Sequence, residues 1–315
     1  MMSTWHRIVF GDCRDMKEIP DNSIHLVVTS PPYYNAPFDY PNLFHDYDEF
    51  LQLLKDVAKE LKRVLAEGRI ACFVTDDMLV HGEKYPIVAD LTRIMVEDGG
   101  FRYRDRIIWK KPEGYIRISR RSGVLIQHPY PMYFYPDNIH ESILIFQKGK
   151  YDYSSSNKGR PKPIIEDSRI DIKQYLEEKW YLSVWEITNV LPLEGRVEEG
   201  VAAFPEEIPR RLIRLFTYKG ETVLDPFLGS GTTMKVAKEL GRNSYGYEIM
   251  TELKPIILRK IGCDYYYNSN NNNNDKHNID NADADDDDAD ADNSSNSNSS
   301  RSRVEVIYQR RREKV

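Results

Sequence analysis

A hydroxyl, two prolines and an aromatic ring stand next to one another in the motif Ser30-Pro31-Pro32-Tyr33, directly after the apolar run 24–29. A short apolar run of this kind is typical of a buried strand in a parallel sheet. Open α/β sheets bind their ligands at the edge where such strands end, so the motif is well placed for function. For these four residues alone, a proline-rich turn with a purely structural role is the other interpretation.

A second motif, the segment 225–233 (DPFLGSGTT), also follows a short apolar run, 222–224. Glycines between a strand and a helix let the backbone approach a ligand closely. The segment does not supply a P-loop, which requires GxxxxGKS or GxxxxGKT. The interpretation as a dinucleotide-binding loop, GxGxxG, is also weakened, because Met234 stands where the third glycine is needed. Two such loops in one chain suggest that two ligands meet.

A carboxylate, Glu248, ends the next predicted strand, about twenty residues after the glycine loop, where dinucleotide folds place a ribose-binding acid. Such a carboxylate can accept hydrogen bonds from both hydroxyls of an unphosphorylated ribose. Glu248 and the loop together therefore favour an adenosine-bearing cofactor with no phosphate to bind. A solvated acid at a strand end is the alternative interpretation of Glu248 alone.

Helix and strand signals alternate along most of the chain. Helices are predicted at 50–64, 86–96, 209–218, 232–240 and 252–261, and strands at 24–29, 70–74, 106–109, 143–147, 222–225 and 244–249. This alternation predicts an α/β fold with a doubly wound, mostly parallel sheet. Between 111 and about 200 the regular alternation fails, which indicates a second region carried on the first. We expect the aromatic cluster 130–135 in that region to be part of its core.

Residues 268–300 are almost entirely Asn, Asp, Ala and Ser, and include nine aspartates and one lysine. Such a segment cannot bury enough apolar surface to form a core, so we expect a disordered insertion. Its net charge of −8 exceeds the total of −6, so the rest of the chain carries +2 and permits a polyanionic partner. A strand pattern returns at 304–308, and we expect it to rejoin the sheet.

The first residues lack the basic and apolar regions of a signal peptide, and no apolar stretch is long enough to span a bilayer. We therefore expect a cytoplasmic protein without a membrane partner. The three cysteines, Cys13, Cys72 and Cys263, are widely separated and show no metal-ligand spacing. We expect buried, reduced thiols and no metal site.

Because it contains both DPFLGSGTT and TSPPY, the chain closely resembles the S-adenosylmethionine-dependent amino methyltransferases of DNA. The resemblance covers about residues 6–111 and 203–262. The motif order resembles that of the beta class, in which the catalytic loop comes first and the cofactor loop last. The resemblance implies a Rossmann-like methyltransferase fold with an inserted target-recognition region. The implied divisions are 1–111 and 201–267 for the catalytic domain, 112–200 for the recognition region, 268–300 for the insertion and 301–315 for a C-terminal strand and basic end.

The resemblance also implies roles for individual residues. The catalytic loop would be Ser30, Pro31, Pro32 and Tyr33. The implied cofactor-binding residues are Asp12, Phe204, Pro205, Asp225, Phe227, Gly229, Ser230, Gly231, Thr232 and Glu248. Of these, Asp12 would contact the adenine amino group and Glu248 the ribose. The implied DNA-binding residues are Lys110, Arg117, Arg120 and Arg121.

The implied chemistry explains the residue types of the catalytic loop. An exocyclic amine is a poor nucleophile because its lone pair is delocalised into the ring. The Ser30 hydroxyl and the Pro31 carbonyl are suited to accept its hydrogens, and Tyr33 offers a face on which an extruded base can stack. Attack on the sulfonium methyl is then direct, so Cys13 needs no nucleophilic role.

The SPPY form of the loop, as opposed to DPPY or NPPY, is associated in this family mainly with the N4 of cytosine. We therefore expect a site-specific cytosine-N4 methyltransferase that flips its target base out of double-stranded DNA. We place it in a restriction-modification system, with a cognate endonuclease acting separately, as a monomer or a homodimer. The alternatives are an adenine-N6 methyltransferase on the same fold, a noncatalytic DNA-binding protein, and a nucleotide-dependent dehydrogenase, which Met234 disfavours.

Overall fold

The computed structural model describes residues 3–35, 43–112, 122–155, 157–188, 204–262, 277–280 and 302–309. The strands are β1 (Trp5–Phe10), β2 (Ile24–Thr29), β3 (Leu65–Thr75), β4 (Met78–Val80), β5 (Glu83–Tyr85), β6 (Arg102–Lys110), β7 (His140–Gln147), β8 (Val184–Glu186), β9 (Thr222–Asp225), β10 (Asn243–Glu248), β11 (His277–Asp280) and β12 (Arg303–Tyr308). The helices are α1 (Tyr47–Val64), α2 (Ile87–Glu97), α3 (Ser122–Gln127), α4 (Lys162–Asp167), α5 (Ile172–Glu177), α6 (Glu207–Phe216), α7 (Thr232–Glu239) and α8 (Lys254–Lys260), with short 3-10 turns η2 (Tyr153–Ser155) and η3 (Thr251–Leu253).

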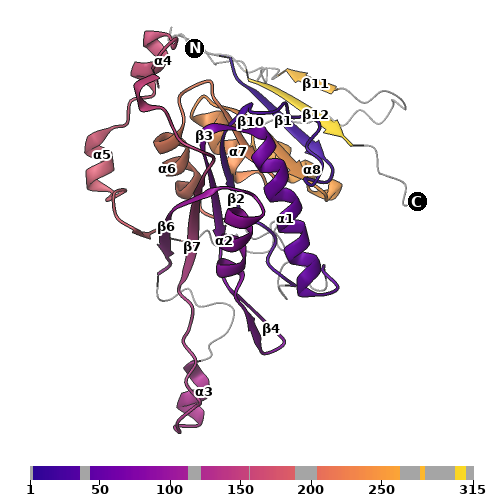
Figure 1. Ribbon diagram of the computed structural model, residues 1–315, viewed down its shortest axis with the longest axis vertical. Helices are drawn as coiled ribbons and strands as arrows, with labels where there is room; N and C mark the ends of the chain where they lie inside the picture. The colour runs from indigo at the N-terminus through magenta and orange to yellow at the C-terminus, as the bar shows by residue number, and fades with distance from the viewer. Residues whose placement is uncertain are drawn as a thin grey trace, which may run out of the picture.

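One mixed sheet of ten strands runs through the described part of the chain in the order β11-β12-β1-β10-β9-β2-β3-β7-β6-β8 (Figure 1). The strands from β12 to β3 are all parallel, and β8 is parallel to β6. Antiparallel pairing occurs at β3–β7, β7–β6 and β11–β12. The prediction of an α/β fold with a mostly parallel sheet is confirmed.

Helices cover both faces of the sheet because successive side chains of its strands point in opposite directions. On one face, Val27 of β2 belongs to the cluster that contains Phe50 and Leu54 of α1. On the other face, Leu26 belongs to the cluster that contains Leu212 of α6. Helix α2 shares the first cluster and α7 the second, which makes the fold doubly wound.

The register of the sheet brings the ends of four strands to one edge. Val27 of β2 lies opposite Leu224 of β9, and both strands run in the same direction. Likewise Asp225 pairs with Gly246 of β10, and Glu248 pairs with Phe10 of β1. The segments that follow β1, β2, β9 and β10 therefore emerge side by side, and they carry the motifs singled out in the sequence.

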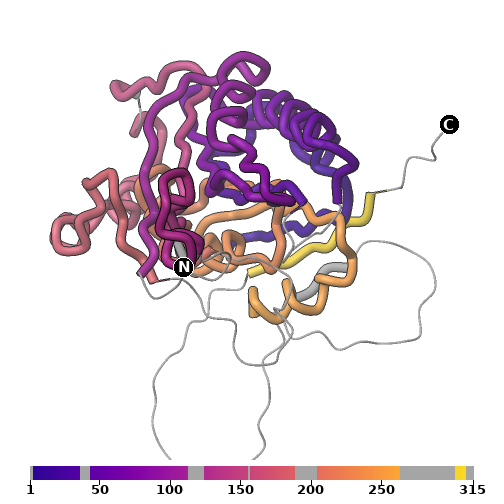
Figure 2. Tube along the Cα trace, turned by 90° about the horizontal axis from the view of Figure 1, so that it is seen from below, coloured from indigo at the N-terminus to yellow at the C-terminus, as the bar shows by residue number. Residues whose placement is uncertain are grey.

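The strand expected at 304–308 is found as β12, and it pairs along the whole of β1, from Trp5 opposite Arg303 to Phe10 opposite Tyr308. Figure 2 shows β12, in yellow, beside β1, in indigo, from a second direction. Of the segment 268–300 the structure describes only β11, which is antiparallel to β12. At these four residues the expectation of disorder is wrong, because they pair with β12. The rest of the segment lies outside the described residues, and there the expectation remains a prediction.

The prediction that the aromatic cluster 130–135 forms part of a core is wrong. Four of its rings are exposed, with exposed fractions of 66% for Tyr130, 43% for Tyr133, 68% for Phe134 and 37% for Tyr135. Helix α3 and the residues after it reach away from the sheet (Figure 1), so no second layer formed by the described residues covers these rings. Aromatic composition indicated burial here, but burial depends on what packs against the segment.

Cys13 and Cys72 are buried and free, as expected, whereas Cys263 lies outside the described residues. No helix in the described part of the chain is long and apolar enough to cross a membrane. The same residues contain no group of three or more His, Cys, Asp or Glu side chains that could hold a metal ion.

Candidate active site

The two sequence motifs are joined by a direct hydrogen bond. Thr29, the last residue of β2, donates from its Oγ1 to Oδ1 of Asp225, the last residue of β9, over 2.6 Å. A second bond, from Oγ1 of Thr233 to the carbonyl of Val28, ties helix α7 to β2 over 3.2 Å. The loop that begins at Ser30 and the loop that begins after Asp225 are thus held against each other at one edge of the sheet.

The glycine loop turns sharply between β9 and α7. Gly229 and Gly231 have φ values of 52° and 89°, in the left-handed region that favours glycine. A Cβ on Gly231 would stand 3.3 Å from Cγ2 of Ile257, so the loop also packs closely on α8. Ser230 is buried, and its Oγ accepts a hydrogen bond from Nζ of Lys260 over 2.8 Å.

Glu248, the last residue of β10, contacts the glycine loop. Its carboxylate is buried and accepts one backbone hydrogen bond on each oxygen, from the N–H of Gly229 and from that of Met250, both over 2.9 Å. Burial raises the pKa of Glu248 above its ordinary value. The carboxylate therefore fixes the loop, and each oxygen keeps a lone pair for a further donor.

Asp12 follows β1, the strand next to β10. Its carboxylate accepts a forked pair of hydrogen bonds from Nε and one terminal nitrogen of Arg14, at 2.9 and 2.6 Å, in a partly exposed position. Its backbone N–H donates to Oε1 of Gln309 over 2.8 Å. Sequence reasoning missed both partners; Gln309 lies just after β12, far along the chain.

Thr232, Phe204 and Pro205 are also buried at this end of the molecule. Phe204 belongs to the core cluster that contains residues of α6 and α7. Oγ1 of Thr232 is buried and has no hydrogen-bond partner among the described residues. A buried hydroxyl without a partner next to a glycine loop fits a bound polar ligand, because leaving it unpaired costs about 1–3 kcal/mol.

Asp225 is the most buried acid of the site, with 3% of its surface exposed. Burial raises its pKa to about 7, although the hydroxyl of Thr29 and the N–H of Phe227 stabilise the carboxylate. Between the ordinary pKa and 7 the folded protein holds a proton on Asp225 that the unfolded chain has lost. The contribution of this group to the free energy of unfolding therefore falls as the pH rises through that window.

We expect Asp225→Asn to remove this pH dependence. Between pH 5 and pH 7 the free energy of unfolding of the wild type, relative to the variant, should fall by about 1.4 kcal/mol per pH unit, and the difference should level off above pH 7. Urea unfolding of both proteins at several pH values measures it, and every other titrating group cancels in the difference. Parallel curves for the two proteins would show that Asp225 titrates normally.

The Ser30 loop contacts a carboxylate that sequence reasoning did not find. Tyr33 is 9% exposed, and its hydroxyl donates to Oε2 of Glu141 over 2.7 Å. Glu141 also forms an ion pair with Lys111. Asp76, which follows β3, lies near Glu141 and accepts a hydrogen bond from Asn138, and burial raises its pKa. The first residues of β7 reach this edge because β7 is antiparallel to β3.

The predicted DNA-binding residues are only partly placed. Lys110, at the end of β6, forms an ion pair with Glu186 of β8 over 3.0 Å. Arg117, Arg120 and Arg121 lie outside the described residues. Their role stays a prediction.

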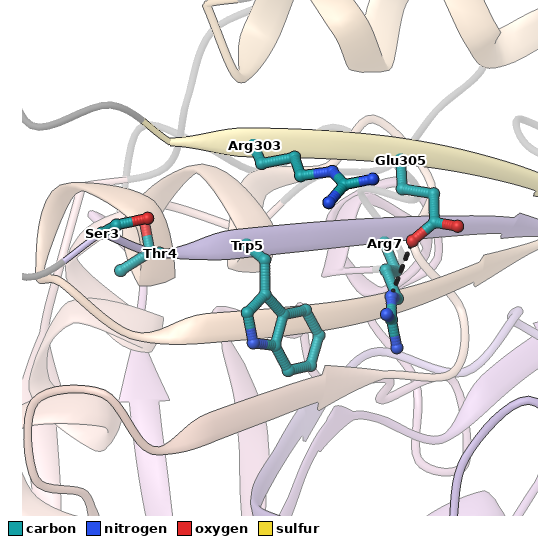
Figure 3. A pocket seen from close by; sticks show the side chains of 6 residues that line it. All are labelled: Ser3, Thr4, Trp5, Arg7, Arg303 and Glu305. Atoms are coloured by element: carbon teal, nitrogen blue, oxygen red, sulfur yellow. Dashed lines mark hydrogen bonds and ion pairs between the residues drawn. The ribbon is translucent and has the colours of Figure 1, made fainter. Parts of the chain in front are cut away.

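A hollow of about 260 Å³ lies elsewhere on the sheet, between the first residues of β1 and β12 (Figure 3). It is lined by Ser3, Thr4, Trp5, Arg7, Arg303 and Glu305. Arg7 and Glu305 point toward each other there and form an ion pair over 2.9 Å. Because β1 and β12 are parallel and begin here, this hollow is at the opposite end of the strands from the loops described above.

The chain is similar to a family of known proteins. Residues 24–259 match the family model N6_N4_Mtase, described as DNA methylase. The chain is 39% identical over 292 residues to type II methyltransferase M.MjaI of Methanocaldococcus jannaschii, covering 83% of this chain and 92% of the relative. It is 32% identical over 286 residues to type II methyltransferase M.MthZI of Methanothermobacter thermautotrophicus, covering 82% and 77%. Among solved structures, TTHA0409 of Thermus thermophilus in complex with S-adenosyl-L-methionine superimposes with a TM-score of 0.63 at 28% identity, over 82% of this chain and 95% of that one.

Proposed function

Because the chain belongs to the DNA methylase family, we propose that it transfers a methyl group from S-adenosylmethionine to the exocyclic N4 of cytosine in a short sequence of duplex DNA. The single observation that carries the proposal is the hydrogen bond between Thr29 and Asp225. It holds the Ser30 loop and the glycine loop together, as a transfer between two ligands requires.

The glycine loop and its neighbours are the proposed cofactor site. Glu248 would accept hydrogen bonds from the ribose hydroxyls, and Asp12 would accept one from the adenine amino group. The loop from Asp225 to Thr232 would line the methionine end. The site fits such a ligand because it presents buried acceptors and a Thr232 hydroxyl that has no partner in the described part of the chain. When bound, S-adenosylmethionine supplies an activated methyl group on a sulfonium. Phe227, partly buried beside the loop, offers a ring that attracts such a cation by about 1 kcal/mol.

The Ser30 loop is the proposed site of the target base. Ser30 and Pro32 are half-buried and Pro31 and Tyr33 buried, so the loop is both rigid and partly open. The hydroxyl of Ser30 and the carbonyl of Pro31 would accept hydrogens of the amine and direct its lone pair outward. The base must leave the duplex to reach this loop, which implies base flipping.

The residue type at position 30 supports cytosine, since it is the feature by which the SPPY loop differs from the DPPY and NPPY forms. The competing substrate is the N6 of adenine, an exocyclic amine of the same chemistry on the same fold. The two substrates give different products, N4-methylcytosine and N6-methyladenine, which can be told apart.

The decisive measurement is nucleoside analysis by mass spectrometry. DNA from a host without its own methyltransferases, expressing this protein, should contain N4-methylcytosine, and sequencing of single molecules should place it in one short sequence. Only N6-methyladenine would overturn the base assignment but not the enzyme class. No modified base at all, from protein that binds S-adenosylmethionine, would favour a noncatalytic DNA-binding protein.

Double-stranded DNA is thus the proposed partner. Lys110, Arg117, Arg120 and Arg121 are proposed contacts, chiefly with phosphates, whose neutralisation makes binding depend on salt. A restriction-modification system in the cytoplasm, with a separate cognate endonuclease, is the proposed setting.

A further inference from the structure

Tyr33 of the Ser30 loop is held by a residue that comes from another strand and another part of the sequence. Its hydroxyl donates to Oε2 of Glu141 over 2.7 Å. Glu141 stands near the start of β7, beyond the residue that pairs with the end of β3. Neither Glu141 nor its strand belongs to the two motifs that define the proposed site.

The two oxygens of Glu141 have different partners. Oε2 accepts from Tyr33, and Oε1 forms the ion pair with Nζ of Lys111, which also lies 4.8 Å from the centre of the Trp109 ring. The side chains of Lys111 and Glu141 are only 19% and 13% exposed, so water screens this pair weakly. Glu141 is therefore held on both sides.

The direction of these hydrogen bonds follows from the groups involved. An ionised carboxylate has no hydrogen to donate, so Tyr33 must be the donor toward Glu141. Burial, reinforced by Glu141, raises the pKa of Tyr33 well above its ordinary value, which keeps the phenol protonated. Ser30 lies in the same loop and acts on this hydroxyl in the opposite sense, because it favours the charged form of Tyr33. With the hydrogen of Tyr33 committed to Glu141, a hydrogen bond between the two hydroxyls can run only from Ser30 to Tyr33.

A bond in that direction leaves Ser30 with its lone pairs only. A serine hydroxyl is both a donor and an acceptor, and which of the two it offers to a ligand depends on where its hydrogen points. Once that hydrogen is directed at Tyr33, Ser30 can only accept from a ligand, as binding an amine N–H requires.

We propose that Glu141 is a positioning residue that acts through Tyr33 to make Ser30 a hydrogen-bond acceptor toward the target amine. This inference rests on the proposed function and extends its site by one residue. Glu141 touches neither the base nor the cofactor in this scheme. Its effect should appear in the rate of methyl transfer rather than in the binding of S-adenosylmethionine.

A double-mutant cycle tests the proposal. Glu141→Gln keeps the shape of the side chain but supplies an amide that can donate, and Tyr33→Phe removes the shared hydroxyl. Each single variant should lower the single-turnover rate roughly 10- to 100-fold, the range for one hydrogen bond to a charged group. If Glu141 acts through Tyr33, the double variant should be no slower than the slower single variant. The affinity for S-adenosylmethionine should stay that of the wild type in all three.

The proposal would be overturned if the two reductions in rate multiply in the double variant, or if Glu141→Gln keeps the wild-type rate. If Glu141→Gln does not fold, Tyr33→Phe still tests the proposal. An unchanged rate in Tyr33→Phe would show that the Tyr33 hydroxyl does not connect Glu141 to Ser30. Asp90→Asn is the matched control: Asp90 accepts a similar bond from the hydroxyl of Tyr47 over 2.8 Å, away from the Ser30 loop, and should keep the wild-type rate. If Ser30→Ala also keeps that rate, it is the proposed function that fails.

Discussion

Ser30→Ala is expected to lower the rate of methyl transfer by about 100- to 1,000-fold, the range seen when one preorganised hydrogen-bonding group is removed from a reaction centre. Ser30 directly follows β2, and no other described side chain of the SPPY loop offers an aliphatic hydroxyl. The proposed cofactor site is built by β1, β9 and β10 instead. Binding of S-adenosylmethionine should therefore be unchanged, as measured by calorimetry beside single-turnover assays with labelled methyl groups.

The matched control is Ser23→Ala at the opposite end of the same strand. Ser23 donates to the carbonyl of Pro20 over 2.6 Å in an exposed turn, and its loss should leave the rate intact. A parallel loss of rate and cofactor affinity in Ser30→Ala would mean that the substitution disturbs the fold. A retained rate would remove the catalytic role from this loop.

Glu248→Ala should have the largest effect on cofactor affinity, raising the dissociation constant of S-adenosylmethionine by about 100-fold or more. The buried carboxylate supplies two acceptors to the proposed ribose site and also holds Gly229 and Met250 by their N–H groups. Losing charge-assisted hydrogen bonds of this kind costs about 3 kcal/mol or more. Calorimetry measures the change directly.

Glu252→Gln provides the comparison for Glu248, since Glu252 is an exposed acid four positions further on. It should bind S-adenosylmethionine as the wild type does. Equal losses in both variants would point to a general effect of negative charge, and an unchanged affinity in Glu248→Ala would place the ribose elsewhere.

Much of the sheet could be predicted from the sequence because parallel strands buried on both faces are short, continuous apolar runs. That the loops after β2 and β9 belong to one site, and that Glu248 acts together with the glycine loop, was predicted because each motif directly follows a strand-like run. These are local signals, and each is complete within a few residues.

Apart from Arg14, which is two residues from Asp12, the contacts that sequence reasoning missed are distant in the chain. Glu141 reaches the Ser30 loop because β7 runs against β3, and nothing in the composition of β7 fixes its direction. Gln309 reaches Asp12 only because β12 returns to β1 after the segment 268–300. The rings of 130–135 were misassigned for the opposite reason, since apolar residues indicate burial only when another layer covers them.

The position of β12 has a consequence for how the chain can be shortened. Val304 and Val306 are buried, and β12 satisfies the backbone along one whole side of β1. A chain ending at residue 267 would turn β1 into an unprotected edge strand carrying Ile8 and Phe10, a template for aggregation. It would also lose the anchor of Asp12. Removing 281–300 while keeping β11 and β12 should spare the sheet, because Asp280 pairs with Arg303 and the two residues left between them are enough for a β-hairpin turn.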